Sequence, residues 1–232
     1  MKEFLIGLAI ICIYFIVCAT IALLCRKLIK IPDEIFRKTL HFILLTSLFV
    51  FVFAYQTWWI SVITCLCIVV IAYPILFFFE RFQSYSETIT ERKKGELRSS
   101  LIIVFLMFSI VISTCWGLLN DKILVLVVIY SWGYGDAFAA LIGKKFGKHK
   151  IYKKKSLEGT LAMFITSVIV VSILLSIVNI IPWYGVIITT IFVSIGVTAV
   201  ELFTPNGLDT VTCPFTSLII MIPLLILFGG LF

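Results

Sequence analysis

The stretch SWGYGDAFAALIGKKFGKHKIYKKKSLEGT, which runs from Ser131 to Thr160, decides the fold of this chain. Its first half is apolar enough to cross a membrane, yet it contains an acid, Asp136. A carboxylate in hydrocarbon costs several kcal/mol unless a partner binds it, so Asp136 is a candidate functional residue. Seven lysines follow between Lys144 and Lys155. The stretch therefore predicts a membrane helix that ends at a strongly basic interface.

Small residues line up with the acid when the stretch is placed on a helix of about 100° per residue. The shared face consists of Asp136, Ala140, Gly143 and Gly147. Glycine lets another group lie close to the backbone. Beyond this face, the Ser156 hydroxyl can cap a new helix that has Glu158 in its first turn. An acid for a metal ion, glycines for close approach and lysines for phosphate together favour a nucleotide site.

Composition sets the protein class independently. Of the 232 residues, 62% are hydrophobic and 13% are charged, and the mean hydropathy is +1.18. These values exclude an ordinary soluble domain. Apolar stretches of about 17 to 25 residues span a bilayer. We expect eight of them, at Phe4 to Leu24, Thr39 to Ala54, Trp58 to Phe79, Leu101 to Leu119, Ile123 to Ile142, Leu161 to Ile181, Trp183 to Phe203 and Phe215 to Phe232.

The predicted fold is thus an all-α, polytopic integral membrane bundle with one domain over residues 1–232. The second segment is the shortest and is expected to begin earlier, near Ile35. The first is expected to be a retained anchor, because no small-residue cleavage site follows it. Gly133 and Gly135, beside aromatic residues, predict a local break in the fifth segment.

The positive charges predict the topology. Of 19 lysines and arginines, five lie between Arg26 and Lys38, five between Arg81 and Arg98, and seven between Lys144 and Lys155. By the positive-inside rule these loops, and the Glu201 to Pro214 loop, lie on the cytoplasmic side. The polar stretch from Glu80 to Arg98 is expected to be a short amphipathic helix or an ordered loop, and Glu96 and Arg98 could reach the active face.

The net charge of +7 does not predict nucleic-acid binding, because no basic surface interleaved with aromatic residues is present. The loop lysines have an alternative role, in which they set the topology and touch anionic lipid. Lys155, beside Ser156, is the lysine for which a functional role is favoured.

These motifs also resemble a known family. The pattern GDAFAALIGKKFGKHKI followed by KKSLEGT is similar to the signature of the membrane CTP-dependent lipid kinases, which include dolichol kinase, phytol kinase and yeast-type diacylglycerol kinase. Two further pieces fit: Arg37-Lys38-x-x-His41, and Glu201 followed by Pro205-Asn206-Gly207-Leu208-Asp209 and Pro214. The family often has Asn directly after the late aspartate, where this chain has Thr210.

The resemblance implies Mg²⁺-dependent transfer of the terminal phosphate of CTP to the hydroxyl of a membrane lipid, which would be a polyprenol, a phytol-like alcohol or diacylglycerol. Asp136, His41 and Arg37 are the candidate catalytic residues. The candidate nucleotide-binding residues are Gly143, Gly147, Lys148, Lys155, Ser156, Glu158 and Gly159. The candidate metal ligands are Asp136, Glu158, Glu201 and Asp209, because Mg²⁺ prefers carboxylates together with phosphate oxygens.

Arg37 and His41 stand at positions i and i+4 and so share a helix face. Arg37 suits bidentate contact with phosphate, and His41 could steer or deprotonate the lipid hydroxyl. Each candidate also has a structural alternative. Asp136 could form a buried ion pair with Arg37 or a lysine, Glu201 could be an interfacial acid, and His41 an interior hydrogen-bonded residue. His149 is expected to be solvated.

Two other functions compete with the lipid kinase. A phosphatidate cytidylyltransferase would share the acid, glycine and lysine chemistry but release pyrophosphate. A lipid or small-molecule transporter would be expected to show paired, glycine-broken helices in two similar halves, and the sequence shows no such halves. Neither the acceptor lipid nor a protein partner can be named from the sequence, and CTP as donor rests on the resemblance.

Overall fold

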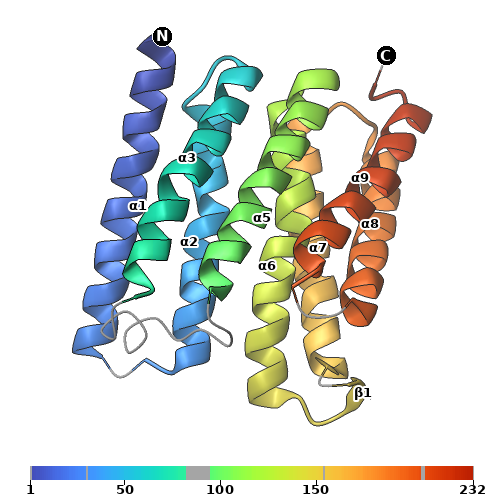
Figure 1. Cartoon of the computed structure of the whole chain (residues 1–232). Helices are drawn as coiled ribbons and strands as arrows, with labels where there is room; N and C mark the ends of the chain where they lie inside the picture. Colours follow the sequence, from blue (N-terminus) through green and yellow to red (C-terminus); the bar gives the residue numbers. More distant parts are fainter. Residues whose placement is uncertain (1, 30, 82–94, 154, 205–206, 232) are drawn as a thin grey trace. The chain divides into compact units, whose positions relative to one another are not determined.

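The computed structural model describes residues 2–29, 31–81, 95–153, 155–204 and 207–231 (Figure 1). These residues form long helices and one two-stranded antiparallel sheet. Within these described ranges, eight helices are long and apolar enough to cross a membrane, which confirms the predicted all-α polytopic fold. The elements are α1 (Lys2–Leu28), α2 (Asp33–Phe53), α3 (Trp58–Phe79), α5 (Glu96–Val111) continued by the π-helix η1 (Ile112–Leu118), α6 (Lys122–Phe146), β1 (Lys150–Tyr152), β2 (Lys155–Ser156), α7 (Leu157–Val178), α8 (Trp183–Phe203) and α9 (Asp209–Leu227).

Helix ends depart from the predicted spans where polar residues extend a helix beyond its apolar run. Helices α3 and α8 have the predicted bounds, and α2 begins at Asp33, as its short apolar run suggested. Helix α6 continues to Phe146 because lysine is a good helix former and its long side chain can reach water from the membrane edge.

The predicted break at Gly133 and Gly135 is wrong. Helix α6 is continuous from Lys122 to Phe146. Gly135 instead lies against α7, where a Cβ would come within 3.0 Å of Met163 Cγ. Glycine is tolerated inside membrane helices when it allows close packing of this kind. The irregular helical segment is η1, where the chain takes the wider π geometry over Ile112–Leu118.

The chain divides into two compact units, Met1–Ser113 and Thr114–Phe232. In the first unit, α1 packs on α2 and α3, and α3 packs on α5. The Glu3 carboxylate accepts the backbone N–H groups of Gln56 (2.7 Å) and Thr57 (3.1 Å), just before α3 begins. Phe51, Phe105 and Phe108 form an edge-to-face cluster with centroids 5.7 to 6.3 Å apart in the core.

In the second unit, α6 is the central helix and contacts α7, α8 and α9. Its closest neighbour is α7, which runs beside it in Figure 1. A Cβ on Gly159 of α7 would lie 2.9 Å from the Ala139 carbonyl oxygen and 3.3 Å from Gly143 Cα. Small residues therefore allow the two backbones to touch, as at other close crossings of membrane helices.

Candidate active site

The junction of α6, the β-hairpin and α7 gathers four of the predicted nucleotide-binding residues. Ser156 caps α7, as predicted, and its Oγ accepts the N–H of Gly159 (3.2 Å). A Cβ on Gly143 would lie 3.2 Å from the same oxygen, and one on Gly147 would lie 2.5 Å from it. The glycines thus make room for a buried serine and for α7. Their contact with a nucleotide stays a prediction.

Lys155 differs from the other loop lysines in the contacts that it makes. Strand β2 directs its side chain to the end of α8, where Nζ lies 2.6 Å from Glu201 Oε1 and also donates to the Glu201 backbone carbonyl. Glu201 is 7% exposed. Since a buried carboxylate is costly without a partner, Lys155 supplies the charge that Glu201 needs. Lys148, also predicted to bind nucleotide, is exposed.

Three of the predicted metal ligands gather in the second unit. The carboxylates of Asp136 and Asp209 lie near enough to Glu201 to repel its negative charge. Within the residues that the structure describes, no three His, Cys, Asp or Glu side chains are close enough to hold a metal ion by themselves. Mg²⁺ commonly binds through one or two carboxylates and completes its shell with phosphate and water. The donor chemistry therefore fits an ion that arrives with a nucleotide.

The fourth predicted ligand, Glu158, has a different partner. His149 Nδ1 lies 2.7 Å from Glu158 Oε1, and the His149 backbone N–H also donates to this carboxylate (3.3 Å). The Leu157 N–H in turn donates to the His149 carbonyl (2.8 Å). His149 is exposed, as expected, but it also closes the base of the hairpin.

The contact between His149 and Glu158 is not apparent from the sequence, because the lysine-rich run around His149 indicates only a charged loop. Lys150-Ile151-Tyr152 alternates polar and apolar residues, but this run is shorter than the roughly four to eight residues over which alternation indicates a strand. The hairpin that turns the chain back toward His149 therefore has no clear signal in the sequence.

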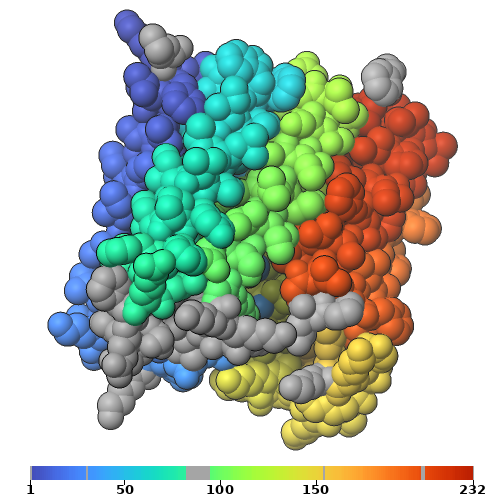
Figure 2. Space-filling model, in the orientation of Figure 1, coloured from blue at the N-terminus to red at the C-terminus, as the bar shows by residue number. Residues whose placement is uncertain are grey.

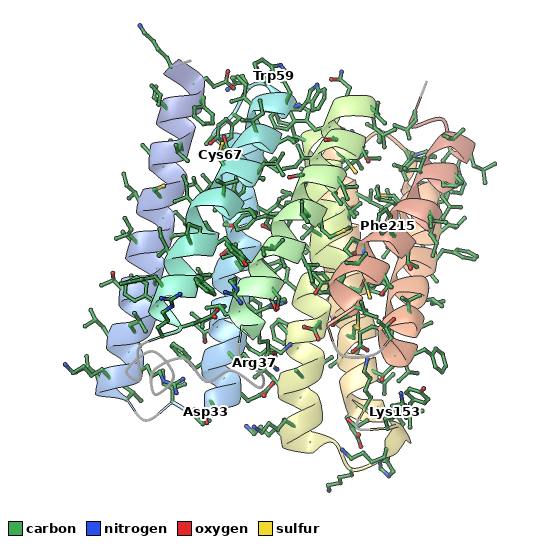
Figure 3. All side chains as sticks on the ribbon, in the orientation of Figure 1. Asp33, Arg37, Trp59, Cys67, Lys153 and Phe215 are labelled. Carbon is green, nitrogen blue, oxygen red and sulfur yellow. The ribbon has the colours of Figure 1, made fainter. Side chains whose placement is uncertain are left out.

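Arg37 and His41 belong to the first unit and lie one turn apart on α2 (Figure 3, where Arg37 is labelled). The Arg37 guanidinium pairs with Glu34 and lies 3.9 Å from Glu96 Oε1 at the start of α5. His41 is partly buried. That Arg37 and His41 act together with Asp136 stays a prediction.

Arg98 packs α5 onto α3. Its guanidinium lies 5.1 Å from the ring centroids of both Tyr73 and Phe77, and Nη1 lies 3.4 Å from Glu80 Oε2. These contacts within the first unit account for Arg98 without a role at the active face. The rest of the predicted amphipathic stretch, residues 82–94, lies outside the described residues, as do Lys154 and the Pro205-Asn206 pair of the family resemblance.

The chain is similar to two curated proteins. It is 26% identical over 176 residues to a protein of Triticum aestivum named "Probable phytol kinase, chloroplastic", a match that covers 71% of this chain and 55% of that protein. It is 32% identical over 99 residues to a phytol kinase of a Synechocystis strain, which covers 40% of each chain. The chain thus spans about half the length of the curated relatives it matches. No family model and no solved structure matches it. The two relatives confirm the resemblance to membrane lipid kinases.

Proposed function

Because this chain is related to the phytol kinases and through them to the family of membrane lipid kinases, we propose that it transfers the terminal phosphate of CTP to the hydroxyl of a membrane lipid. The acceptor belongs to the isoprenoid alcohols, of which phytol and the polyprenols are examples, or is diacylglycerol. The reaction depends on Mg²⁺ and takes place at the cytoplasmic face, where the basic loops lie by the positive-inside rule.

One observation carries the proposal most directly: Asp136 and Asp209 each lie near Glu201 in the second unit, and Lys155 is bound to Glu201. Phosphoryl transfer asks little covalent chemistry of a protein. It requires a metal ion to bridge the phosphates, cations to spread the developing charge, and a positioned acceptor. A group of carboxylates beside a lysine supplies the first two requirements.

In this proposal Asp136 and Asp209 would hold Mg²⁺, and the ion would supply positive charge to the nucleotide phosphates. A lysine ammonium has three N–H donors, and Glu201 accepts two of those of Lys155. The third can reach a phosphate oxygen without loss of the two contacts to Glu201. Gly143 and Gly147 seat Ser156 and the start of α7 against the end of α6, beside which the phosphates would bind. Arg37 binds phosphate, and His41 orients or deprotonates the acceptor hydroxyl.

The test is direct. The purified protein is incubated with Mg²⁺, each of four nucleoside triphosphates labelled on the terminal phosphate, and a panel of dolichol, undecaprenol, phytol, diacylglycerol and phosphatidate. We expect label to move into a lipid alcohol, CTP to serve best as donor, and transfer to stop when the metal is chelated. The Asp136→Asn protein, prepared in the same way, is the matched control.

Other outcomes identify the alternatives. Label that appears only in pyrophosphate, with phosphatidate as the sole active lipid, would make the protein a cytidylyltransferase. Movement of a lipid across vesicles, with no labelled lipid in any reaction, would make it a transporter. Transfer that survives chelation would remove the metal from the proposal.

A further inference from the structure

The end of α6 and the hairpin that follows it carry a concentrated positive charge. Between Asp136 and Glu158 the chain contains no acid. The described part of this region has five exposed lysines, which we call the basic hairpin surface: Lys144, Lys145, Lys148, Lys150 and Lys153. Figure 2 shows the region in yellow at the surface of the molecule, and in Figure 3 Lys153 is labelled at the hairpin. A surface with this positive charge is complementary to an anionic partner.

Two large apolar side chains lie among these lysines. Phe146 is 56% exposed and Ile151 is 48% exposed. Lys145 Nζ lies 5.1 Å from the centre of the Phe146 ring, so the ammonium group and the ring are adjacent on the surface. Apolar side chains ringed by lysines are the pattern of a segment at the membrane interface, because the apolar parts enter the acyl boundary while the ammonium groups stay at the headgroups.

The dimensions of the fold put this surface at headgroup depth. Helix α6 has 25 residues, which gives a length of about 37 Å against a hydrocarbon core of about 30 Å. With Asp121 and Lys122 at the opposite edge of the hydrocarbon, its last turn, with Lys144 to Phe146, extends beyond the hydrocarbon. Strand β1 has three residues, and at about 3.3 Å per residue it reaches only about 10 Å further. The hairpin lies within or just above the headgroup layer.

The hairpin is also held in a fixed orientation. The Tyr152 ring meets the Phe203 ring of α8 edge-on, with centroids 5.5 Å apart, and Lys155 binds Glu201 of the same helix. The pairing of β1 with β2 is irregular between Lys150 and Tyr152, and the Ile151 side chain at this place is exposed. The basic hairpin surface is thus presented outward on a rigid support.

We propose that the basic hairpin surface binds anionic phospholipid headgroups of the surrounding bilayer, with Phe146 and Ile151 inserted at the acyl boundary. The partner is a lipid surface of negative charge, separate from the nucleotide and from the lipid that accepts the phosphate. The charged part of this interaction weakens with salt, because exposed charges are screened. The apolar part does not.

The experiment measures backbone hydrogen exchange in the full chain, reconstituted in nanodiscs of phosphatidylcholine alone or with one third phosphatidylglycerol. We expect the amides of residues 147–153 to exchange several-fold more slowly in the anionic discs, and high salt to remove the difference. Amides at the start of α6, near Lys122, are the internal control and should exchange equally in both discs.

Variants distinguish an effect of the lysine charge from an effect on folding. Replacing Lys144, Lys145, Lys150 and Lys153 together by Gln should abolish the difference between the two discs, while the same four changes to Arg should keep it. Replacing a single one of these lysines by Gln is expected to weaken the binding of anionic lipid by about fivefold. Phe146→Ser with Ile151→Ser should speed exchange in both discs.

Three results would overturn the proposal. One is equal exchange of residues 147–153 in the two discs for the unmodified protein. Another is a difference that persists in the four-fold Gln variant. The last is full protection of the amides of residues 147–153 from exchange when nucleotide is added in neutral discs. This result would show that the basic hairpin surface binds the nucleotide. Because no step of the experiment measures phosphate transfer, its failure and that of the proposed reaction are distinguishable.

Discussion

Lys155 and Glu201, which are 46 positions apart in the chain, form an ion pair with Nζ 2.6 Å from Oε1, and the same ammonium also donates to the Glu201 backbone carbonyl. The pair joins strand β2 to the end of α8. It brings a residue of the KKSLEGT motif into contact with the acid that precedes the late Pro-Asn-Gly-Leu-Asp motif. Two separate pieces of the family resemblance therefore meet through one contact.

Breaking this pair should destabilise the second unit. In Lys155→Met, Glu201 keeps a buried carboxylate with no cation beside it. The Lys155 side chain is 25% exposed, so we expect a loss of about 2 kcal/mol, below the value for a fully buried pair. Detergent-solubilised protein can be followed by thermal unfolding. Adding Glu201→Gln should restore part of the loss, and strictly additive effects of the two changes would show that the pair contributes nothing.

Asp136→Asn should abolish phosphate transfer and leave the protein folded in the membrane. Removing a charge from hydrocarbon does not impair insertion, but it takes away a ligand of the proposed metal ion. The measurement is turnover of the purified variant with labelled CTP and lipid, with thermal unfolding compared in parallel. Activity above a tenth of that of the unmodified protein would defeat the assignment of Asp136 to the metal.

Hydropathy predicted the eight spans because each is a continuous apolar run, and it predicted α3 and α8 to the residue because polar residues or proline flank both runs. It could not locate the end of α6, where lysines continue the helix. Nor could it decide between a break and close packing at Gly135, since both use glycine. The answer depends on Met163, 28 positions away, which lies against it.

The sequence singled out residues of the candidate site but not the contacts that they make. Residue types and spacing singled out Ser156, Lys155 and Glu201, and the structure brings each into a specific interaction. The partners themselves, Lys155 with Glu201 and His149 with Glu158, come from the hairpin and from the packing of α8. No helical or strand periodicity encodes such long-range pairs.

The glycines at the crossing of α6 and α7 should differ in their tolerance of alanine. A Cβ on Gly159 would lie 2.9 Å from the Ala139 carbonyl oxygen, whereas one on Gly143 would lie 3.2 Å from the Ser156 hydroxyl. Backbone cannot move aside as a side chain can, so Gly159→Ala should cost about 1 to 3 kcal/mol and Gly143→Ala less. Thermal unfolding of the two variants provides the comparison. A greater loss for Gly143→Ala would contradict this account of the crossing.

In the first unit, Tyr55 should make stability depend on pH under alkaline conditions. Its side chain is fully buried, with Gly7 directly against the ring, and burial raises the pKa of the phenol to about 12. The unfolded chain loses this proton near pH 10 and the folded chain keeps it, so the folded state binds more protons between these values. The free energy of unfolding should therefore fall as pH rises from about 10 to 12, by at most about 2.7 kcal/mol. Tyr55→Phe lacks the titrating group and should show a flatter decline, while the other ionisable groups contribute equally to both proteins. Parallel curves for the two proteins over this range would show that the Tyr55 phenol titrates alike in the folded and unfolded chains.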